Sequence, residues 1–310
     1  MMSFPKYSFV LPAYKGRFLY EALASILGQT YFDFELIVVD DCSPDGIRKI
    51  VESFQDSRIT YHRNEHNIGG KNLVQQWNHC LKYAKAEYVI LATDDDLYEP
   101  TFLEEMDSLV KKYPKINLFR ARILQVDAEN HIRDIDRCYK EVLTQEEFYY
   151  HMFHGMRGGI PQYVFRRKVL IEKCGFVDFP KAWASDDATA LMMAENGVGN
   201  SQNHLVRFRW SDVNISSDKK NMLEKVKARI LFGAWLKKNV PKVPRETEEG
   251  MFLYKNVNEY LPIYNKITIL SHFKRTPIVQ RIKGLRLLCA TDVFSFKDKL
   301  SLTLRSLILF

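Results

Sequence analysis

Cysteine is scarce in this chain, and its cysteines show no pairing pattern. There are five, an odd number, spread along the length without a Cys-x-x-Cys motif: Cys42, Cys80, Cys138, Cys174 and Cys289. This arrangement argues against a disulfide framework and against a thiolate zinc site. We therefore expect a reducing, cytoplasmic setting.

Long hydrophobic runs are also absent. No stretch of about 18 or more apolar residues occurs, so no membrane-spanning helix is predicted, and the first residues lack the pattern of a signal peptide. Hydrophobic residues make up 46% of the chain and charged residues 27%. That balance is typical of a soluble globular protein with a substantial core.

The basic charge is concentrated in the last third of the chain. Residues 215–310 contain 19 Lys and Arg against 8 Asp and Glu, whereas the whole chain contains 45 against 38. The preceding residues are therefore slightly acidic. A basic segment of this kind indicates an anionic partner, such as a membrane surface or a nucleic acid.

Strand-like and helix-like segments alternate over the first 112 residues, which predicts an α/β fold with a mostly parallel sheet flanked by helices. The alternation is looser after residue 115, and from about Ser216 the pattern is helical. Strands are expected at Tyr7–Leu11, Phe34–Asp40, Ile59–His62, Tyr88–Ala92 and Leu118–Val126, and helices at Phe18–Leu27, Ile47–Phe54, Lys71–Ala84, Pro100–Lys112, Thr144–Phe153 and Asp186–Glu195.

Three of the expected strands run into polar residues. Pro12–Tyr14, Asp40–Asp41 and Thr93–Asp96 each stand at the end of such a strand. In an open α/β sheet, ligands bind outside the carboxyl ends of the strands. We therefore predict that these residues lie along one edge of the sheet and form one pocket.

The triplet Asp94–Asp96 is the sharpest of these signals. Three adjacent carboxylates repel one another, and the cluster is unfavourable unless a cation or hydrogen-bond donors compensate it. Mg²⁺ or Mn²⁺ would do so through one or two carboxylates together with substrate phosphates. The alternative is a solvated loop at the start of a helix, where acidic residues are also favoured.

The motifs in the first part of the chain, taken in order, resemble those of a known enzyme family. Tyr7–Gly46 runs from an apolar strand into Pro-x-Tyr, then to Gln29-Thr30 and on to Asp-Asp-x-Ser. Asn67–Asn72 adds an Asn-x-Gly stretch, and Thr93–Pro100 adds an acidic motif followed by a proline. Over roughly its first 110 residues, the chain resembles the GT-A-fold family 2 glycosyltransferases. That likeness implies a GT-A-type, Rossmann-like sheet with helices on its faces.

The resemblance implies a role for each matching residue. The nucleotide base and ribose pocket would consist of Pro12, Ala13, Tyr14, Asp40 and Asp41. Lys71 would approach the base or diphosphate, and Asp94 would lie nearest the ribose. Asp95 would hold the metal, Mn²⁺ or Mg²⁺, with Asp96 beside it. One departure is that many relatives have Asp where this chain has Thr93.

The same likeness implies a catalytic base. Members of the family generally invert the anomeric centre in a single displacement, which needs one carboxylate to take a proton from the acceptor hydroxyl. The stretch Trp183–Thr189 resembles the family's acidic motif at the start of a helix and aligns Asp186 with the family's aspartate. Asp187 is the second candidate because the register is uncertain by one. The alternative is that Ser185 and Asp186 only cap a helix.

Three further residues are candidates for the acceptor side. His154 and Arg157 belong to a glycine-containing loop that resembles the family's acceptor-side loop, although ordinary loop structure explains the glycines equally well. Trp183 could stack on a sugar face, but a core tryptophan is the more common outcome.

The basic C-terminal segment carries no recognised motif. Lys and Arg alternate there with Ile, Val and Leu, which is the pattern of an amphipathic helix lying on an anionic membrane. Contact with the inner face of the cytoplasmic membrane would suit a lipid-linked acceptor. The alternative is a helical subdomain packed on the catalytic domain with its basic face in solvent.

We predict a catalytic domain over residues 1–214, with a nucleotide-sugar-binding half (1–112) and an acceptor-side half (113–214), followed by a basic helical region (215–310). The expected function is metal-dependent transfer from a nucleoside-diphosphate sugar, UDP being favoured, to a hydroxyl on a cell-surface polysaccharide or lipid-linked glycan. The alternatives are a sugar-1-phosphate nucleotidyltransferase and a non-enzymatic nucleic-acid-binding protein. No nucleic acid is expected as a partner, because no nucleic-acid-binding motif is present.

Overall fold

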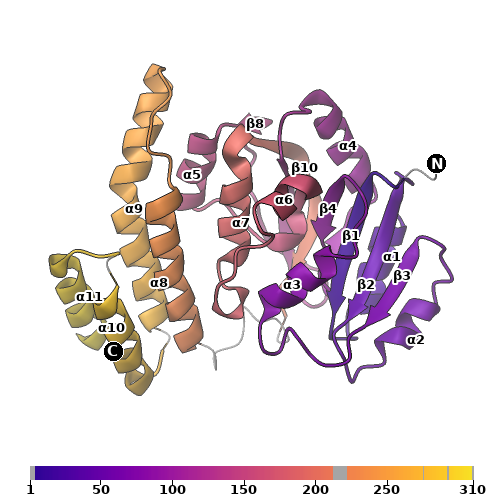
Figure 1. Ribbon diagram of the computed structural model, residues 1–310, viewed down its shortest axis with the longest axis horizontal. Helices are drawn as coiled ribbons and strands as arrows, with labels where there is room; N and C mark the ends of the chain where they lie inside the picture. The colour runs from indigo at the N-terminus through magenta and orange to yellow at the C-terminus, as the bar shows by residue number, and fades with distance from the viewer. Residues whose placement is uncertain (1–3, 212–221, 275, 292, 309–310) are drawn as a thin grey trace.

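One twisted sheet with helices on both faces forms the centre of the molecule (Figure 1). The computed structural model describes residues 4–211, 222–274, 276–291 and 293–308. Its first half consists of β1 (Tyr7–Ala13), α1 (Leu19–Leu27), β2 (Phe34–Asp40), α2 (Ile47–Glu52), β3 (Ile59–Arg63), α3 (Leu73–Leu81), β4 (Tyr88–Leu91), β5 (Leu97–Tyr98) and α4 (Phe102–Lys112).

The remaining elements complete the sheet and then become helical. They are β6 (Leu118–Val126), β7 (Ile132–Ile135), β8 (Val142–Leu143), α5 (Gln145–Phe153), η1 (Ile160–Gln162), β9 (Tyr163–Arg166), α6 (Arg167–Glu172), η2 (Pro180–Ala182), α7 (Ser185–Met193), η3 (Ala194–Asn196), β10 (Val198–Arg209), α8 (Met222–Asn239), α9 (Glu248–Lys274), α10 (Ile278–Ala290) and α11 (Phe296–Ile308).

The strand order brings the ends of the three predicted strands together at one edge of the sheet, as the sequence predicts. The order is β3-β2-β1-β4-β9-β6-β10-β5, with β7 paired to β6 and β8 to β10. Strands β3, β2, β1 and β4 are parallel, β10 is parallel to β6, and β9 runs antiparallel to both of its neighbours. The predicted α/β fold with a mostly parallel sheet is confirmed, and the ends of β1, β2 and β4 share one edge.

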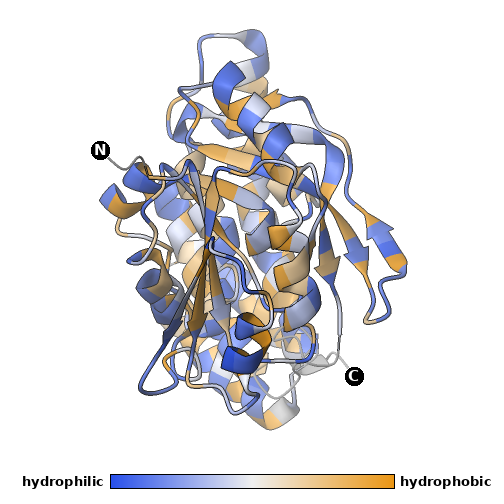
Figure 2. Ribbon diagram, turned by 90° about the vertical axis from the view of Figure 1, so that its right-hand side faces the viewer, coloured by the Kyte–Doolittle hydropathy of each residue, from blue (hydrophilic) through white to orange (hydrophobic). Residues whose placement is uncertain are grey.

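Both faces of the sheet are buried, and alternate strand residues belong to different cores. On β1, Phe9 and Leu11 pack with α1, α2 and α4, whereas Val10 packs on the opposite side with α3 and α5. Because side chains alternate along a strand, a strand covered on both faces needs a continuous apolar run. Figure 2 shows apolar colour on the central strands between the helices.

The longest strand, β10, was not predicted from the sequence. It contains Asn200, Ser201, Gln202, Asn203 and His204, and so many polar residues are typical of a loop. The pairing with β6 shifts register twice around His204, so the polar stretch passes through an irregular part of the ladder. Beyond it, the strand carries residues 206–209 to the ligand edge.

The C-terminal helices pack against the catalytic part. Helix α8 contacts α7 and η2, α9 contacts α5, and Ala228 and Phe232 of α8 lie in the same apolar core as Leu191 of α7. Helices α10 and α11 form a second layer outside α8 and α9 (Figure 1). The predicted domain boundary after residue 214 and the predicted helix start near Ser216 both fall outside the described residues. Within the described ranges, no helix is both long and apolar enough to cross a membrane.

Gly197, which immediately precedes β10, provides a test of how β10 packs against β8. Its backbone, at φ 92° and ψ −179°, lies in a region that is essentially restricted to glycine, and an added Cβ would lie 2.8 Å from the carbonyl oxygen of Leu143. We expect Gly197→Ala to lower the free energy of unfolding by about 3 kcal/mol or more, measured by denaturant titration.

The matched control is Gly155→Ala. Gly155 has φ 90°, but no atom lies within 4 Å of an added Cβ, so only backbone strain applies. We expect a loss of about 1 kcal/mol. Equal losses in the two variants would contradict the packing described for Gly197.

Candidate active site

A cavity of 560 Å³ lies at the carboxyl ends of β1, β2 and β4. One wall consists of the residues that follow these strands, including Tyr14, Asp41 and Asp95. A second part of the wall consists of residues 158–160, residues 181–184, Asp186, Asp187 and Arg229 of α8. Figure 1 shows α7 and α8 side by side next to the sheet. We call the first part the donor end and the second the acceptor end, after the roles that the sequence resemblance predicts for their residues.

At the donor end, each aspartate of the triplet has a different set of partners. Asp94 accepts hydrogen bonds from the backbone N–H groups of Tyr14 (3.0 Å) and Lys15 (2.8 Å). Asp96 accepts one from the Thr93 hydroxyl (2.5 Å) and one from the backbone N–H of Arg209 (2.7 Å). Asp94 therefore holds the loop after β1 in place through hydrogen bonds, and Asp96 does the same for the end of β10.

The three carboxylates retain a marked tendency to hold protons. Burial, followed by repulsion from Asp94, raises the pKa of Asp95 to about 6. Burial also raises the pKa of Asp94, and burial together with the charge of Asp95 raises the pKa of Asp96 well above its usual range. Oxygen ligands of this kind suit Mg²⁺ or Mn²⁺, whose charge would favour the ionised forms. The residues present therefore fit such a cation.

Arg209, at the end of β10, was not predicted as a site residue. It is 1% exposed, and its Nε donates to the carbonyl oxygen of Asp95 (2.9 Å). Its other nitrogens donate to the carbonyl of Ala128 and to the carboxylate of Glu21, both at 2.7 Å. Arg209 thus holds the backbone of the triplet in place. No sequence signal could have found it, because the strand that carries it was not predicted.

The two predicted aspartates after β2 have different positions. Asp41 lines the cavity and accepts from the backbone N–H groups of Ile68 (2.8 Å) and Gly69 (2.7 Å), so it holds the loop before α3. Asp40 is fully buried behind it, where it bonds with Tyr61 and Arg63. Of this pair, Asp41 alone faces the cavity.

At the acceptor end, Asp186 and Asp187 lie in the first turn of α7. Burial, followed by the charge of Asp187, raises the pKa of Asp186 to about 7. Asp187 faces the Arg229 guanidinium, with 3.7 Å between Oδ2 and Nη1. Burial raises the pKa of Asp187, and Arg229 opposes that shift. The charge of Arg229 also opposes the shift of Asp186, but only Asp187, of these two, lies at ion-pair distance from the guanidinium.

The capping hypothesis for this turn is not supported. Ala184 occupies the N-cap position in a left-handed conformation and makes no side-chain cap. The hydroxyl of Ser185 instead accepts from the backbone N–H of Phe179 (3.1 Å) and stabilises the segment before the helix. Asp186 accepts a hydrogen bond from the backbone N–H of Asp187 (2.9 Å).

The cavity brings together most of the predicted site residues but not all of them. Those that line it are Pro12, Tyr14, Asp41, Asp94, Asp95, Asp96, Trp183, Asp186 and Asp187. Its lining, as far as the described residues go, leaves out Ala13, Asp40, Lys71, His154 and Arg157. It includes Lys15, Trp77, Gln125, Lys181, Phe208, Trp210 and Arg229, for which no site role was predicted.

The two weakest predictions have structural explanations elsewhere. The ring of His154 stacks on Tyr150 and on Tyr260 of α9, with centroids 4.2 and 4.6 Å apart. Arg157 pairs with Asp134 at 2.5 Å, and its carbonyl accepts from the buried Arg120. Both residues stabilise the surroundings of the cavity, and nothing here places them on an acceptor.

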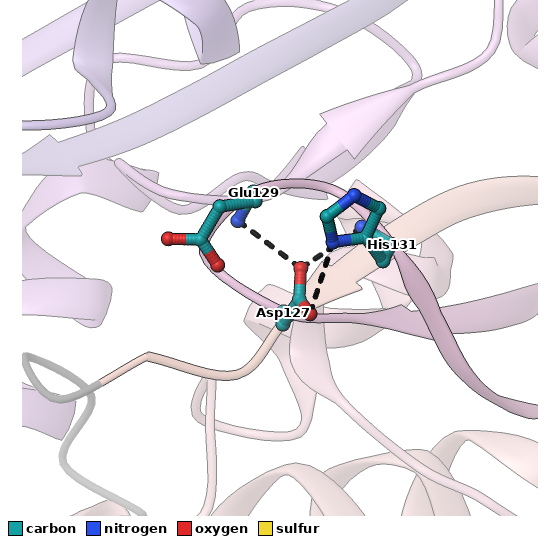
Figure 3. Close-up of side chains that lie close together, drawn as sticks. All are labelled: Asp127, Glu129 and His131. Carbon is teal, nitrogen blue, oxygen red and sulfur yellow. Dashed lines mark hydrogen bonds and ion pairs between the residues drawn. The ribbon is translucent and has the colours of Figure 1, made fainter.

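One further group of possible metal ligands lies in the turn between β6 and β7. Asp127, Glu129 and His131 have ligand atoms within 4.8 Å of one another (Figure 3). The carboxylate of Asp127 already accepts from the backbone N–H groups of Glu129 (3.1 Å) and His131 (2.9 Å). These bonds form the turn and account for the closeness of the three side chains.

Comparison with known proteins places this geometry in a family. Residues 8–175, more than half of the chain, match the family model described as glycosyl transferase family 2. An uncharacterised glycosyltransferase of Rickettsia typhi is 28% identical over 243 residues, covering 76% of this chain and 72% of that protein. The UDP-Glc:alpha-D-GlcNAc-diphosphoundecaprenol beta-1,3-glucosyltransferase of Escherichia coli is 35% identical over 106 residues, covering 34% of this chain and 41% of that enzyme.

Solved structures share the fold. The Staphylococcus aureus TarS fragment 1–349, in complex with UDP-GlcNAc, superposes with a TM-score of 0.65 at 17% identity, covering 96% of this chain and 90% of that one. A mannosyltransferase of Pyrobaculum calidifontis, in complex with GDP-Man and Mn²⁺, gives a TM-score of 0.55 at 18% identity, covering 100% of this chain and 82% of that one. These likenesses confirm the predicted GT-A-type fold.

The matched residues extend from β1 to just past α6 and contain the residues of the cavity that follow β1, β2 and β4, whereas β10 and the residues of α7 and α8 lie beyond the match. The chain belongs to glycosyl transferase family 2 and is a glycosyltransferase.

Proposed function

We propose that the protein transfers a sugar from a nucleoside-diphosphate sugar, with UDP the favoured nucleotide, to a hydroxyl of a cell-surface polysaccharide or lipid-linked glycan, with inversion at the anomeric carbon. The observation that carries the proposal is a single cavity that is lined both by a carboxylate triplet after β4 and by a separate carboxylate pair on α7. Transfer needs these two functions, one at the leaving group and one at the nucleophile.

The donor end is proposed to hold the diphosphate and its cation. Asp95 would bind Mn²⁺ or Mg²⁺, since Asp94 and Asp96 already accept two hydrogen bonds each. Asp96 lies beside it and adds negative charge. When bound, the cation neutralises charge that develops on the departing diphosphate. Tyr14, which is 40% exposed, and Asp41 are proposed to contact the base and ribose.

The acceptor end is proposed to supply the base through Asp186. Its pKa of about 7 suits a group that must be ionised before it takes a proton and must hold that proton afterwards. Asp187 is the weaker candidate because it forms the ion pair with Arg229, which favours its ionised form and so lowers its basicity, whereas the charge of Arg229 is a lesser cause of the pKa of Asp186. Inversion by one displacement needs no second nucleophilic carboxylate, and the two aspartates have separate tasks.

Contact with a membrane is part of the proposal for the C-terminal helices. On α10 and α11, apolar side chains are exposed next to basic ones: Val279 (68%), Ile282 (48%), Phe296 (84%) and Leu300 (53%) lie on the same two helices as the exposed Lys283, Arg286 and Lys297. Such a surface fits an anionic bilayer, where apolar side chains enter the interface and cations meet the headgroups.

Asp95→Asn tests the donor end. Titration calorimetry with UDP and with GDP, each with and without Mn²⁺, should show tighter binding of UDP when Mn²⁺ is present. The variant should weaken that binding by about tenfold or more, because the amide carries no charge for the cation. Asp33→Asn, which changes an exposed aspartate outside the cavity, is the control and should bind as the unchanged protein does. Folded protein that binds neither nucleotide would overturn the donor-site assignment.

Asp186→Asn tests the base. In slow hydrolysis of the UDP-sugar without acceptor, water takes the place of the acceptor hydroxyl, and UDP release gives the rate. We expect the rate to fall by about 10²- to 10⁴-fold. For the unchanged protein, kcat/KM should fall as the pH drops through about 7, because protonation removes the base.

Stability supplies a second measurement on the same variant. The pKa of Asp186 is raised in the folded protein, so its ionised form is penalised above the pKa of the unfolded chain, and the penalty is complete above about pH 7. Asp186→Asn should therefore raise Tm at pH 8. A larger loss of activity in Asp187→Asn than in Asp186→Asn would reverse the assignment.

Charge reversal tests the membrane surface. The double variant Lys283→Glu and Arg286→Glu should lose most binding to anionic phospholipid vesicles in a flotation assay, since each basic residue contributes about 1 kcal/mol near an anionic surface. The control carries Lys82→Glu and Lys168→Glu, which reverse two exposed charges on the catalytic part. If the unchanged protein does not float with anionic vesicles, the membrane proposal is wrong.

A further inference from the structure

Three residues just before α7 have a backbone conformation that is unusual for their type. Lys181, Ala182 and Ala184 have φ angles of 57°, 55° and 67°, in the left-handed region, and none of them is glycine. This region is unfavourable for a residue with a Cβ, because the Cβ comes too close to a carbonyl oxygen. The other non-glycine residues with positive φ, as far as the chain is described, are scattered singly: Cys42, Gln55, Asn130 and Cys174. Backbone strain is therefore concentrated directly before Asp186, the proposed base.

Hydrogen bonds within the segment hold the strained residues in place. Such bonds are needed, because strain of this kind persists only where the surrounding structure enforces it. The backbone N–H of Ala182 donates to the carbonyl of Phe179 (2.9 Å), and that of Trp183 donates to the carbonyl of Pro180 (3.2 Å). The N–H of Phe179 donates to the hydroxyl of Ser185 (3.1 Å). The chain between Phe179 and Ser185 is therefore closed into a compact turn that contains the strained residues.

On one side, the segment is attached to the loop before α3. Asp178 accepts a hydrogen bond from the side-chain amide of Asn72 (2.6 Å), and the ammonium group of Lys181 donates to the carbonyl of Gly70 (3.5 Å). Gly70 and Lys181 both line the cavity. The same loop is the one that Asp41 holds at the donor end. The strained segment therefore has a direct connection to the donor end.

On the other side, the segment packs against α8. Ala182 and Ala184 are buried, at 9% and 5% exposed, in the same apolar core as Phe232 of α8. Between them, the ring centroid of Trp183 lies 4.4 Å from Nζ of Lys225, which is also on α8. With a different φ at either alanine, the chain would leave this core, and the first turn of α7 would change direction with it. The left-handed backbone therefore allows both methyl groups to be buried while α7 begins at the cavity.

We propose that Ala182 and Ala184 are positioning residues for the transfer reaction. Their left-handed backbone, fixed between the loop before α3 and helix α8, sets where the Asp186 carboxylate stands relative to the donor. The inference rests on the proposed function, in which Asp186 is the base. Glycine would adopt this backbone without strain, but it would adopt others as readily. The methyl groups restrict the chain to the arrangement that buries them, and the strain is the consequence of that restriction.

Ala182→Gly and Ala184→Gly, made singly, test the inference. Each removes strain together with one buried methyl group, so the two effects should largely cancel and leave Tm within about 2 °C of that of the unchanged protein. UDP release is measured from UDP-glucose or UDP-N-acetylglucosamine, whichever the unchanged protein hydrolyses faster. The variants should show a kcat about tenfold lower, with KM for the UDP-sugar unchanged, because the base is less precisely placed. Hydrogen–deuterium exchange in peptides from residues 177–190 should become at least about threefold faster.

The matched control is Ala190→Gly. Ala190 is also buried, but it lies within helix α7, so its methyl group is lost without any relief of strain. The Tm of this variant should fall by about 4 °C. The comparison shows whether strain is present at residues 182 and 184, because an equal fall of Tm in all three variants would overturn the inference.

A second result would also overturn it: a kcat and an exchange rate in Ala182→Gly and Ala184→Gly that equal those of the unchanged protein. The strain would then have no effect on Asp186. Failure of the proposed function is seen separately, as hydrolysis that Asp186→Asn does not slow or as no hydrolysis at all. The exchange measurement does not depend on activity. In that case, faster exchange would support the positioning of the first turn of α7 by the two alanines, and unchanged exchange would overturn it.

Discussion

The cavity depends on the way in which three adjacent aspartates are kept apart at the end of β4. Asp94 bonds toward the loop after β1, and Asp96 bonds toward β10, so each carboxylate turns in a different direction. Arg209 adds a donor to the carbonyl of Asp95 and fixes the backbone between them. A repulsive triplet thereby becomes the junction of three strands. The same bonds leave Asp95 as the carboxylate with the fewest protein partners.

Thr93 has a place in this arrangement. Where many family members carry an aspartate, this chain has a hydroxyl that donates to Asp96. A fourth carboxylate at this point would add repulsion to a cluster whose pKa values are already raised, whereas the hydroxyl relieves it. Compared with an aspartate at this position, Thr93 therefore gives the triplet one more hydrogen-bond donor and one negative charge fewer.

The sequence predicted those parts of the site that follow apolar strands. The ends of β1, β2 and β4 could be located because continuous apolar runs, which must be buried on both faces, give way abruptly to polar residues. Single-residue positions were less certain. Asp40 and Asp41 are adjacent, and only the side chain direction at the end of β2 decides that Asp41 meets the cavity. Strand β10, which carries Arg209, could not be predicted because the residues from Asn200 to His204 are polar. This stretch forms a strand by pairing with β6 and not because of its own composition. Arg229 could not be distinguished from the other basic residues of α8, since its role depends on how α8 packs against α7.

The two ends of the cavity use carboxylates under opposite constraints. At the donor end, hydrogen-bond donors from β1 and β10 hold the triplet, and a cation would further favour its ionised state. At the acceptor end, Asp187 forms an ion pair with Arg229, whereas the same arginine acts on the pKa of Asp186 through its charge without an ion pair, and this difference separates the affinities of the two for a proton. A pair in which both residues met a cation would have two weak bases, and a pair in which neither did would share one proton between them. Placing a single arginine on a helix outside the sheet avoids both outcomes. The C-terminal helices therefore act on the chemistry of the cavity as well as covering one face of the core.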